Sequence, residues 1–162
     1  MSDLDDLYQE VILDHGRSPR NFYALPGASH HAEGSNPLCG DRVHVELILR
    51  GKNGGATIDD IAFTGAACAI CLASASMMTE HVKGLSTCET RRTAEDFRRM
   101  LVGGGGGEEA LADSPLLALA GVRKFPMRVK CATLPWHTLL AALDSGDAAA
   151  PAGIERTPVS TE

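Results

Sequence analysis

Three cysteines and one aspartate are the residues of this sequence best suited to hold a metal ion or to carry sulfur. Cys39 and Asp41 stand one residue apart in the segment NPLCGD, where Asn-Pro and Gly-Asp favour a turn. Cys68 lies where an expected strand passes into a helix, and Cys131 lies where the last helix is expected to begin. Thiolates and carboxylates are both zinc ligands, so these four side chains form a suitable set for one ion.

The spacing of the four residues leaves two interpretations open. The cysteines are much farther apart than the paired ligands of zinc fingers, and small thiols are often buried with no further role. In that plain interpretation the three thiols are unrelated, and Asp41 only caps its own turn. In the other interpretation the ends of several elements converge on one site.

Local charge around two of the cysteines favours the thiolate form. Helix starts at Cys68 and Cys131 would place the positive end of a helix dipole beside each sulfur. Four cations precede Cys131 within eight residues: Arg123, Lys124, Arg128 and Lys130. We expect Arg123 to lie near the thiolates, because a fixed cation offsets their negative charge.

Several other residues with suitable chemistry have plainer explanations. Cys71 forms a C-x-x-C pair with Cys68, but no thioredoxin-like pattern surrounds it, and we interpret it as a buried structural thiol. Cys88 is expected in a loop without a role. The histidines are expected to be solvated or unassigned rather than metal ligands: His30 and His31 in a loop, His44 exposed on a strand, and His137 in the last helix.

Composition narrows the class of protein. A chain of 162 residues fits one domain, and a formal charge of −6 gives no support for nucleic-acid binding. Five cysteines are an odd number, and the acidic N-terminus does not resemble a signal peptide, so we expect a reducing, cytoplasmic setting. The uncharged segment 61–79 is rich in Ala, Ser and Thr, and a strand, a turn and a buried helix explain it better than a membrane span.

Hydrophobic periodicity predicts an α+β fold, with helices packed on one face of a small antiparallel sheet. Strict alternation over Val43 to Arg50 predicts a half-buried strand, and Thr57 to Thr64 returns beside it. Residues 17–37 lack periodicity and are expected to form a loop. Helical spacing predicts five helices, at residues 3–15, 68–83, 93–102, 115–120 and 131–143.

The boundaries of these helices depend on a few punctuating residues. Thr93 and Asp96 suggest a capping box, and Pro135 is expected to be tolerated because it lies near a first turn. Five consecutive glycines, Gly103 to Gly107, predict a flexible surface loop without an assigned role. Residues 144–162 are poor in large apolar side chains, so the domain is expected to end at residue 143 and a disordered tail to follow.

Three motifs together resemble the SufU type of iron–sulfur cluster assembly protein, in the IscU/NifU N-terminal superfamily. They are NPLCGD, TGAACAICLASASMMTE and KFPMRVKCATLPWHTL, and they occur in consistent order within residues 4–143. The resemblance implies a three-stranded antiparallel sheet with helices packed on it. It also implies zinc ligands at Cys39, Asp41, Cys68 and Cys131.

Two features make the sequence resemble the SufU type more than the IscU type of the superfamily. IscU-type scaffolds carry a histidine immediately before the third cysteine, whereas this sequence has Lys130. The SufU type also carries an extra segment before that cysteine, and residues 84–121 provide room for it. The resemblance therefore implies a zinc-dependent sulfurtransferase that takes persulfide sulfur from a cysteine desulfurase (SufS-type) on Cys39 and passes it to a downstream cluster scaffold.

Two alternatives to sulfur transfer stay open. The chain can be a scaffold that assembles and hands on an iron–sulfur cluster, because three thiolates and a labile oxygen ligand also suit iron or a transient cluster. It can also be a purely structural zinc domain. In each case we expect no nucleic-acid partner and no membrane partner.

Overall fold

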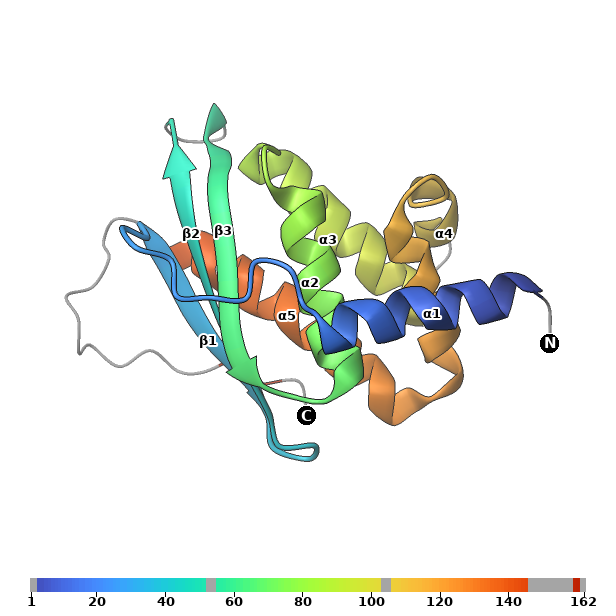
Figure 1. The fold of residues 1–162 in the computed structure, drawn as a ribbon. Coiled ribbons are helices and arrows are strands. Elements are labelled where there is room, and N and C mark those ends of the chain that lie inside the picture. Colours follow the sequence, from blue (N-terminus) through green and yellow to red (C-terminus); the bar gives the residue numbers. More distant parts are fainter. Residues whose placement is uncertain (1–2, 52–54, 103–105, 146–158, 161–162) are drawn as a thin grey trace.

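Figure 1 shows the computed structural model, which describes residues 3–51, 55–102, 106–145 and 159–160. The chain begins with helix α1, continues through three strands, and ends largely in helices. The elements are α1 (Asp3–Arg17), β1 (His30–Asn36), β2 (Asp41–Arg50), β3 (Thr57–Ala66), α2 (Ala69–Val82), α3 (Thr87–Val102), α4 (Gly107–Ala110), the 3-10 helix η2 (Pro115–Lys124), α5 (Pro126–Ser145) and β4 (Val159–Ser160).

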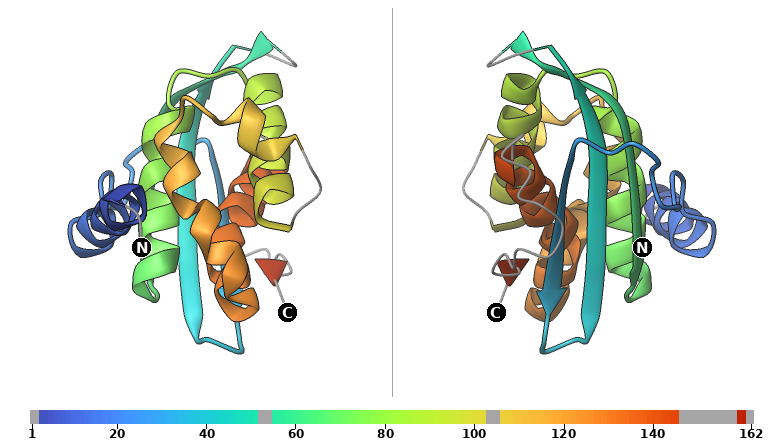
Figure 2. Two further views of the ribbon diagram at one scale, coloured as in Figure 1. Left: turned by 90° about the vertical axis from the view of Figure 1, so that its right-hand side faces the viewer. Right: turned by 90° about the vertical axis from the view of Figure 1, so that its left-hand side faces the viewer.

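The sheet has β2 at its centre, with β1 and β3 antiparallel to it on either side. The two residues of β4 extend the sheet beyond β1 in the parallel direction. Helices α2 and α5 pack on one face of the sheet, and α1 lies on the outside of the helical layer beside α2 (Figure 2). The predicted α+β class and the three-stranded antiparallel sheet are confirmed.

Strand β2 shows why the sheet has one buried face. Its residues alternate in burial along the strand, so that Val43, Val45 and Leu47 lie in the core while Arg42 is exposed. Side chains of a strand point alternately to its two faces, and the apolar set must therefore meet the helices together. The alternation expected for Val43 to Arg50 holds as far as Leu47; the pairing with β3 shifts between Ile48 and Leu49, where both side chains are half-buried.

The prediction of a loop at residues 17–37 is wrong for its C-terminal part, where strand β1 forms. The inward positions of β1 are buried, but they carry small or polar side chains instead of large apolar ones. Hydrophobic periodicity consequently gives no signal there, although the burial itself alternates as in any half-buried strand. The inward residues are His30, Ala32, Gly34 and Asn36.

Two helix starts also differ from expectation. Helix α3 begins at Thr87, because Ser86 and Glu89 form a reciprocal capping box: Ser86 N–H donates to the Glu89 carboxylate, and Glu89 N–H donates to Ser86 Oγ, both at 3.0 Å. Helix α5 begins at Pro126, which suits the first turn because proline has no N–H to offer. Pro135 therefore lies in the interior of α5, contrary to expectation.

Three further expectations concern segments at the margins of the described residues. Of the five glycines, 103–105 lie outside the described residues, while Gly106 caps α4 and Gly107 begins it. Most of the expected tail, 146–158 and 161–162, also lies outside them, and the domain boundary at residue 143 stays a prediction. Among the helices that the structure describes, none is both long and apolar enough to cross a membrane.

Strand β1 approaches α5 closely at Gly34. A Cβ atom built on Gly34 would collide with Oγ1 of Thr138 and would come within 3.1 Å of Leu134 Cδ1. Thr138 is held in place by its own hydrogen bond of 2.8 Å to the Leu134 carbonyl. Only glycine thus allows β1 to lie this close to the helix.

We expect Gly34→Ala to destabilise the protein by about 1–3 kcal/mol, because the added methyl group overpacks the contact with α5. For a chain of this size that corresponds to about 2–4 °C in Tm per kcal/mol, measured by thermal unfolding. Gly121→Ala is the matched control, since a Cβ at Gly121 meets no atom within 4 Å. An equal Tm for the two variants would contradict the close approach.

Candidate metal centre

The turn between β1 and β2 carries Cys39. Asn36 closes the turn: its carbonyl accepts hydrogen bonds from Cys39 N–H at 3.1 Å and Gly40 N–H at 2.8 Å. Gly40 has a φ of 73°, in the left-handed region that favours glycine. Asp41, the first residue of β2, is buried at 2% exposure, whereas Cys39 is half-buried.

Asp41 is joined to Cys68 by its two carboxylate oxygens. Cys68 is the N-cap of α2, and its backbone N–H donates to Asp41 Oδ1 at 2.8 Å. The other oxygen, Oδ2, lies 3.7 Å from Cys68 Sγ. One oxygen thus fixes the carboxylate on the helix terminus and leaves the other facing the thiols, an arrangement typical of an oriented metal ligand.

Cys131 reaches the same place from α5. It is fully buried, and its Sγ lies 3.6 Å from Cys39 Sγ. Helices α2 and α5 are joined at this level by the Ser74 hydroxyl, which donates to the Ala132 carbonyl at 2.5 Å. The hydrogen bond keeps Cys131 at a set position relative to the start of α2.

Two of the distances between donor atoms match those that one zinc ion would require. Zn–S bonds of about 2.3 Å and Zn–O bonds of about 2.1 Å, at tetrahedral angles, place two sulfurs about 3.8 Å apart and a sulfur and an oxygen about 3.6 Å apart. The corresponding distances are 3.6 Å for Cys39–Cys131 and 3.7 Å for Cys68–Asp41. Ligand atoms of Cys39, Asp41 and Cys131 all lie within 4.8 Å of one another, and Cys68 adjoins this group through Asp41.

Burial sets the protonation of Cys131. Burial, followed by hydrogen bonds with Asp41 and Cys39, raises the pKa of the Cys131 thiol far above its usual value. The expectation that a helix start favours the Cys131 thiolate is wrong, since Cys131 lies in the second turn of α5. Several acidic groups here share a small, buried volume, and a divalent cation would offset their mutual repulsion.

The cation beside the thiols is Arg128. Hydrogen bonding to Cys131, together with the charges of Cys68 and Cys131, raises the pKa of the Arg128 guanidinium. Arg123, which we expected there, instead pairs with Glu108 of α4 and lies 3.4 Å from the Met100 carbonyl. The helical register of α5 explains the difference, because Arg128 is three residues before Cys131 and on the same side of the helix.

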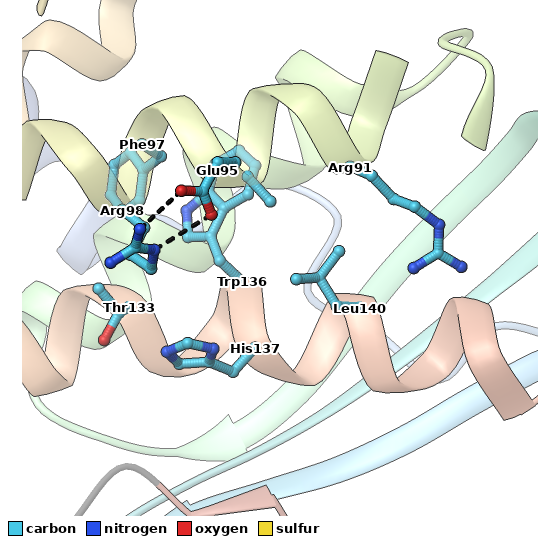
Figure 3. A pocket seen from close by; sticks show the side chains of 9 residues that line it. Arg91, Glu95, Phe97, Arg98, Thr133, Trp136, His137 and Leu140 are labelled. Carbon is cyan, nitrogen blue, oxygen red and sulfur yellow. Dashed lines mark hydrogen bonds and ion pairs between the residues drawn. The ribbon is translucent and has the colours of Figure 1, made fainter. Parts of the chain in front are cut away.

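Of the remaining candidates, Cys71 packs beside this centre, in one buried cluster with Cys131, Val43 and Leu134. Cys71 is fully buried, and desolvation raises the pKa of its thiol, as suits a structural residue. Cys88 is exposed on α3, so the expectation of a loop at this position is wrong. His137 lies in a separate pocket between α3 and α5, beside the Arg98–Glu95 ion pair of 2.6 Å (Figure 3). Burial lowers the pKa of His137.

Comparisons with known proteins agree on the kind of chain this is. The profile of the family described as NifU-like N terminal domain matches residues 7–132. Zinc-dependent sulfurtransferase SufU from Bacillus subtilis (strain 168) is 38% identical over 138 residues, 85% of this chain and 90% of that protein. Iron–sulfur cluster assembly scaffold protein IscU from Streptococcus pyogenes serotype M1 is 38% identical over 144 residues, 88% of this chain and 86% of that protein.

A solved structure has the same fold. It is a protein described as an iron–sulfur cluster assembly scaffold for the SUF system, from Fervidobacterium islandicum AW-1. It matches with a TM-score of 0.75 and 33% identity, covering 83% of this chain and 94% of that one. The relatives therefore carry two functional descriptions, sulfurtransferase and scaffold, at equal identity in the two sequences compared.

We expect Asp41→Asn to bind zinc more weakly and to release it faster. Asparagine keeps the size of Asp41 and can still accept the Cys68 N–H, but it replaces a charged ligand with a neutral one. The release rate is measured by transfer of zinc to a coloured chelator. Asp59→Asn, at an exposed ion pair with Arg50, is the control; equal rates in both variants would leave Asp41 as a turn residue only.

Proposed function

This chain belongs to the NifU-like N-terminal domain family of iron–sulfur cluster assembly proteins, and from that premise we propose that it is a zinc-dependent sulfurtransferase. It accepts persulfide sulfur from a cysteine desulfurase of the SufS type and passes it to a downstream cluster scaffold. The zinc ligands are Cys39, Asp41, Cys68 and Cys131, and the sulfur acceptor is Cys39. The setting is the cytoplasm, without a nucleic-acid or membrane partner.

The observation that carries the proposal is the different anchoring of the three thiols. Cys131 is inside a helix and fully buried, and Cys68 caps α2 beside Asp41. Cys39 is half-buried in a turn next to Gly40, so its backbone can move with the least disturbance to the fold. Of the three sulfurs, that of Cys39 is the one that can leave a shared ion while the other ligands remain.

The surface around Cys39 is suited to meet a sulfur donor. Cys39 lines an open pocket together with Leu38, Pro126, Met127 and Lys130. Leu38 and Met127 are large apolar side chains with 61% and 64% of their surface exposed. Exposed apolar side chains beside a reactive group are typical of a docking surface, and Lys130 adds a positive charge that favours a thiolate at Cys39.

The proposed transfer needs no oxidant or reductant. The Cys39 thiolate attacks the outer sulfur of the donor's persulfide, whose S–S bond breaks as a new S–S bond forms on Cys39. The donor cysteine leaves as a thiolate, and the sulfane sulfur keeps its proton. Bound zinc would hold the thiolates deprotonated without changing redox state. Arg128, beside Cys131 and Cys68, offsets negative charge during the exchange.

Scaffold function is the competing proposal, because the Streptococcus relative carries that name at the same identity. Lys130, where the IscU type has histidine, favours the sulfurtransferase. The two proposals predict different metals in protein purified without oxygen. We expect colourless protein with one zinc ion per chain by elemental analysis; brown protein with iron and acid-labile sulfide would support the scaffold instead.

We expect Cys39→Ala to abolish stimulation of a cognate cysteine desulfurase while the fold persists. After reaction of the wild-type protein with desulfurase and free cysteine, mass spectrometry should place about 32 Da, one sulfur atom, on the peptide that contains Cys39. Cys88→Ala removes an exposed thiol away from the centre and is the matched control. Sulfur found mainly on Cys68, Cys71 or Cys131 would overturn the assignment of the acceptor.

A further inference from the structure

A pair of histidines lies on the face of the sheet opposite the helices. His31 on β1 and His44 on β2 point away from the core, and Nδ1 of His31 lies 3.2 Å from Nε2 of His44. Their rings meet edge to face, with centroids 5.2 Å apart and planes at 74°. The pairing of β1 with β2, which residue periodicity did not predict, brings them together.

We propose that His31 and His44 form a second metal site, which binds one divalent transition-metal ion by two imidazole nitrogens. Metal–nitrogen bonds of about 2.0–2.1 Å to two nitrogens 3.2 Å apart give an angle of about 100° at the metal. That angle is close to the tetrahedral value and to the value of about 90° in tetragonal sites. The two nitrogens therefore need little movement to hold one ion.

To bind an ion, the two neutral imidazole rings must rearrange their hydrogens between ring nitrogens, but neither ring has to lose a proton. At 3.2 Å one ring nitrogen donates to the other, so a hydrogen atom occupies the space between them. The ion takes that place when His31 carries its hydrogen on Nε2 and His44 carries its hydrogen on Nδ1. Both of the facing nitrogens then present a lone pair to the ion.

Two carboxylates stand opposite the histidines on the paired strands. Glu33 is opposite His44 in the strand register, and Glu46 is opposite His31. Directly opposed side chains on one face lie within about 4.5–5.5 Å of each other at Cβ. Glu33 also lies 3.9 Å from Arg42, and Glu46 accepts the Leu25 N–H at 3.1 Å. Both carboxylates are thus engaged with other partners, and they favour a cation at the imidazoles through their charge alone.

The class of ion follows from the ligands. Within the described ranges, Cys39, Asp41 and Cys131 are the only group of three or more His, Cys, Asp or Glu side chains whose ligand atoms lie close to one another. The histidine pair thus supplies two protein ligands, and water completes the coordination. Imidazole suits Zn²⁺, Ni²⁺ and Cu²⁺, whereas Mg²⁺ and Ca²⁺ prefer oxygen, so the site should select the first three.

An ion at this site would join β1 to β2 outside the core. Binding to the folded state alone stabilises it, so the ion should raise Tm. The joined strands lead into the turn that carries Cys39, but the histidines and the cysteines lie on opposite faces of the sheet. Binding at the histidines is therefore independent of whether the cysteine centre holds zinc.

The test uses Ni²⁺ and the full chain, kept reduced with a phosphine in place of a thiol. We expect Ni²⁺, which is paramagnetic, to broaden the imidazole NMR signals of His31 and His44 before those of any other histidine. His31→Gln and His44→Gln should each abolish this effect. His137→Gln removes a histidine on the other side of the sheet and should leave it unchanged.

Two results would overturn the proposal. One is an absence of broadening at His31 and His44 up to about 1 mM Ni²⁺. The other is seen if, in His31→Gln or His44→Gln, the histidine that remains is broadened by Ni²⁺ as strongly as in the wild type. If a variant does not fold, the broadening measured in the wild-type protein decides the proposal by itself. Asp41→Asn should still show the broadening of the His31 and His44 signals. That outcome distinguishes binding at the histidines from loss of metal binding at the cysteine centre.

Discussion

The distance between β1 and α5 is the constraint on which the cysteine centre depends. Gly34 lets the strand lie against Thr138, and the turn that carries Cys39 begins two residues after Gly34. Cys131 lies about two helical turns before Thr138 along α5. A larger residue at position 34 would move the strand outward, and the 3.6 Å separation of Cys39 and Cys131 would increase with it. Packing far from the sulfurs thus determines their spacing.

The sequence predicted those elements whose buried residues are large and apolar. β2 and β3 were found because Val45 and Leu47 alternate with polar residues, whereas β1 was missed because Gly34 and its inward neighbours are small or polar. Helix α3 begins at Thr87, earlier than the predicted start at residue 93, because its capping box is formed by Ser86 and Glu89. In each error a local signal existed, but it was of a different kind from hydrophobic periodicity.

The four residues of the centre were predicted from their chemistry and from a family resemblance; the structure brings Cys39, Asp41 and Cys131 together, and Cys68 contacts Asp41. What the sequence did not reveal is their electrostatic setting. Cys131 was expected at a helix start, yet it is inside α5, where burial raises the pKa of its thiol. The cation beside it is Arg128, because helical register and not closeness in sequence decides which side chain reaches a sulfur.

The two faces of β2 carry the two groups of possible ligands. Asp41 and the core residue Val43 point toward the helices, and His44 points away. Because side chains alternate along a strand, a shift of one residue in its pairing would exchange the two faces. Asp41 would then lie in solvent and His44 in the core, where its ring would need a new partner. The alternation that buries Val43 and its neighbours therefore also keeps Asp41, beside the thiols, apart from the imidazole of His44.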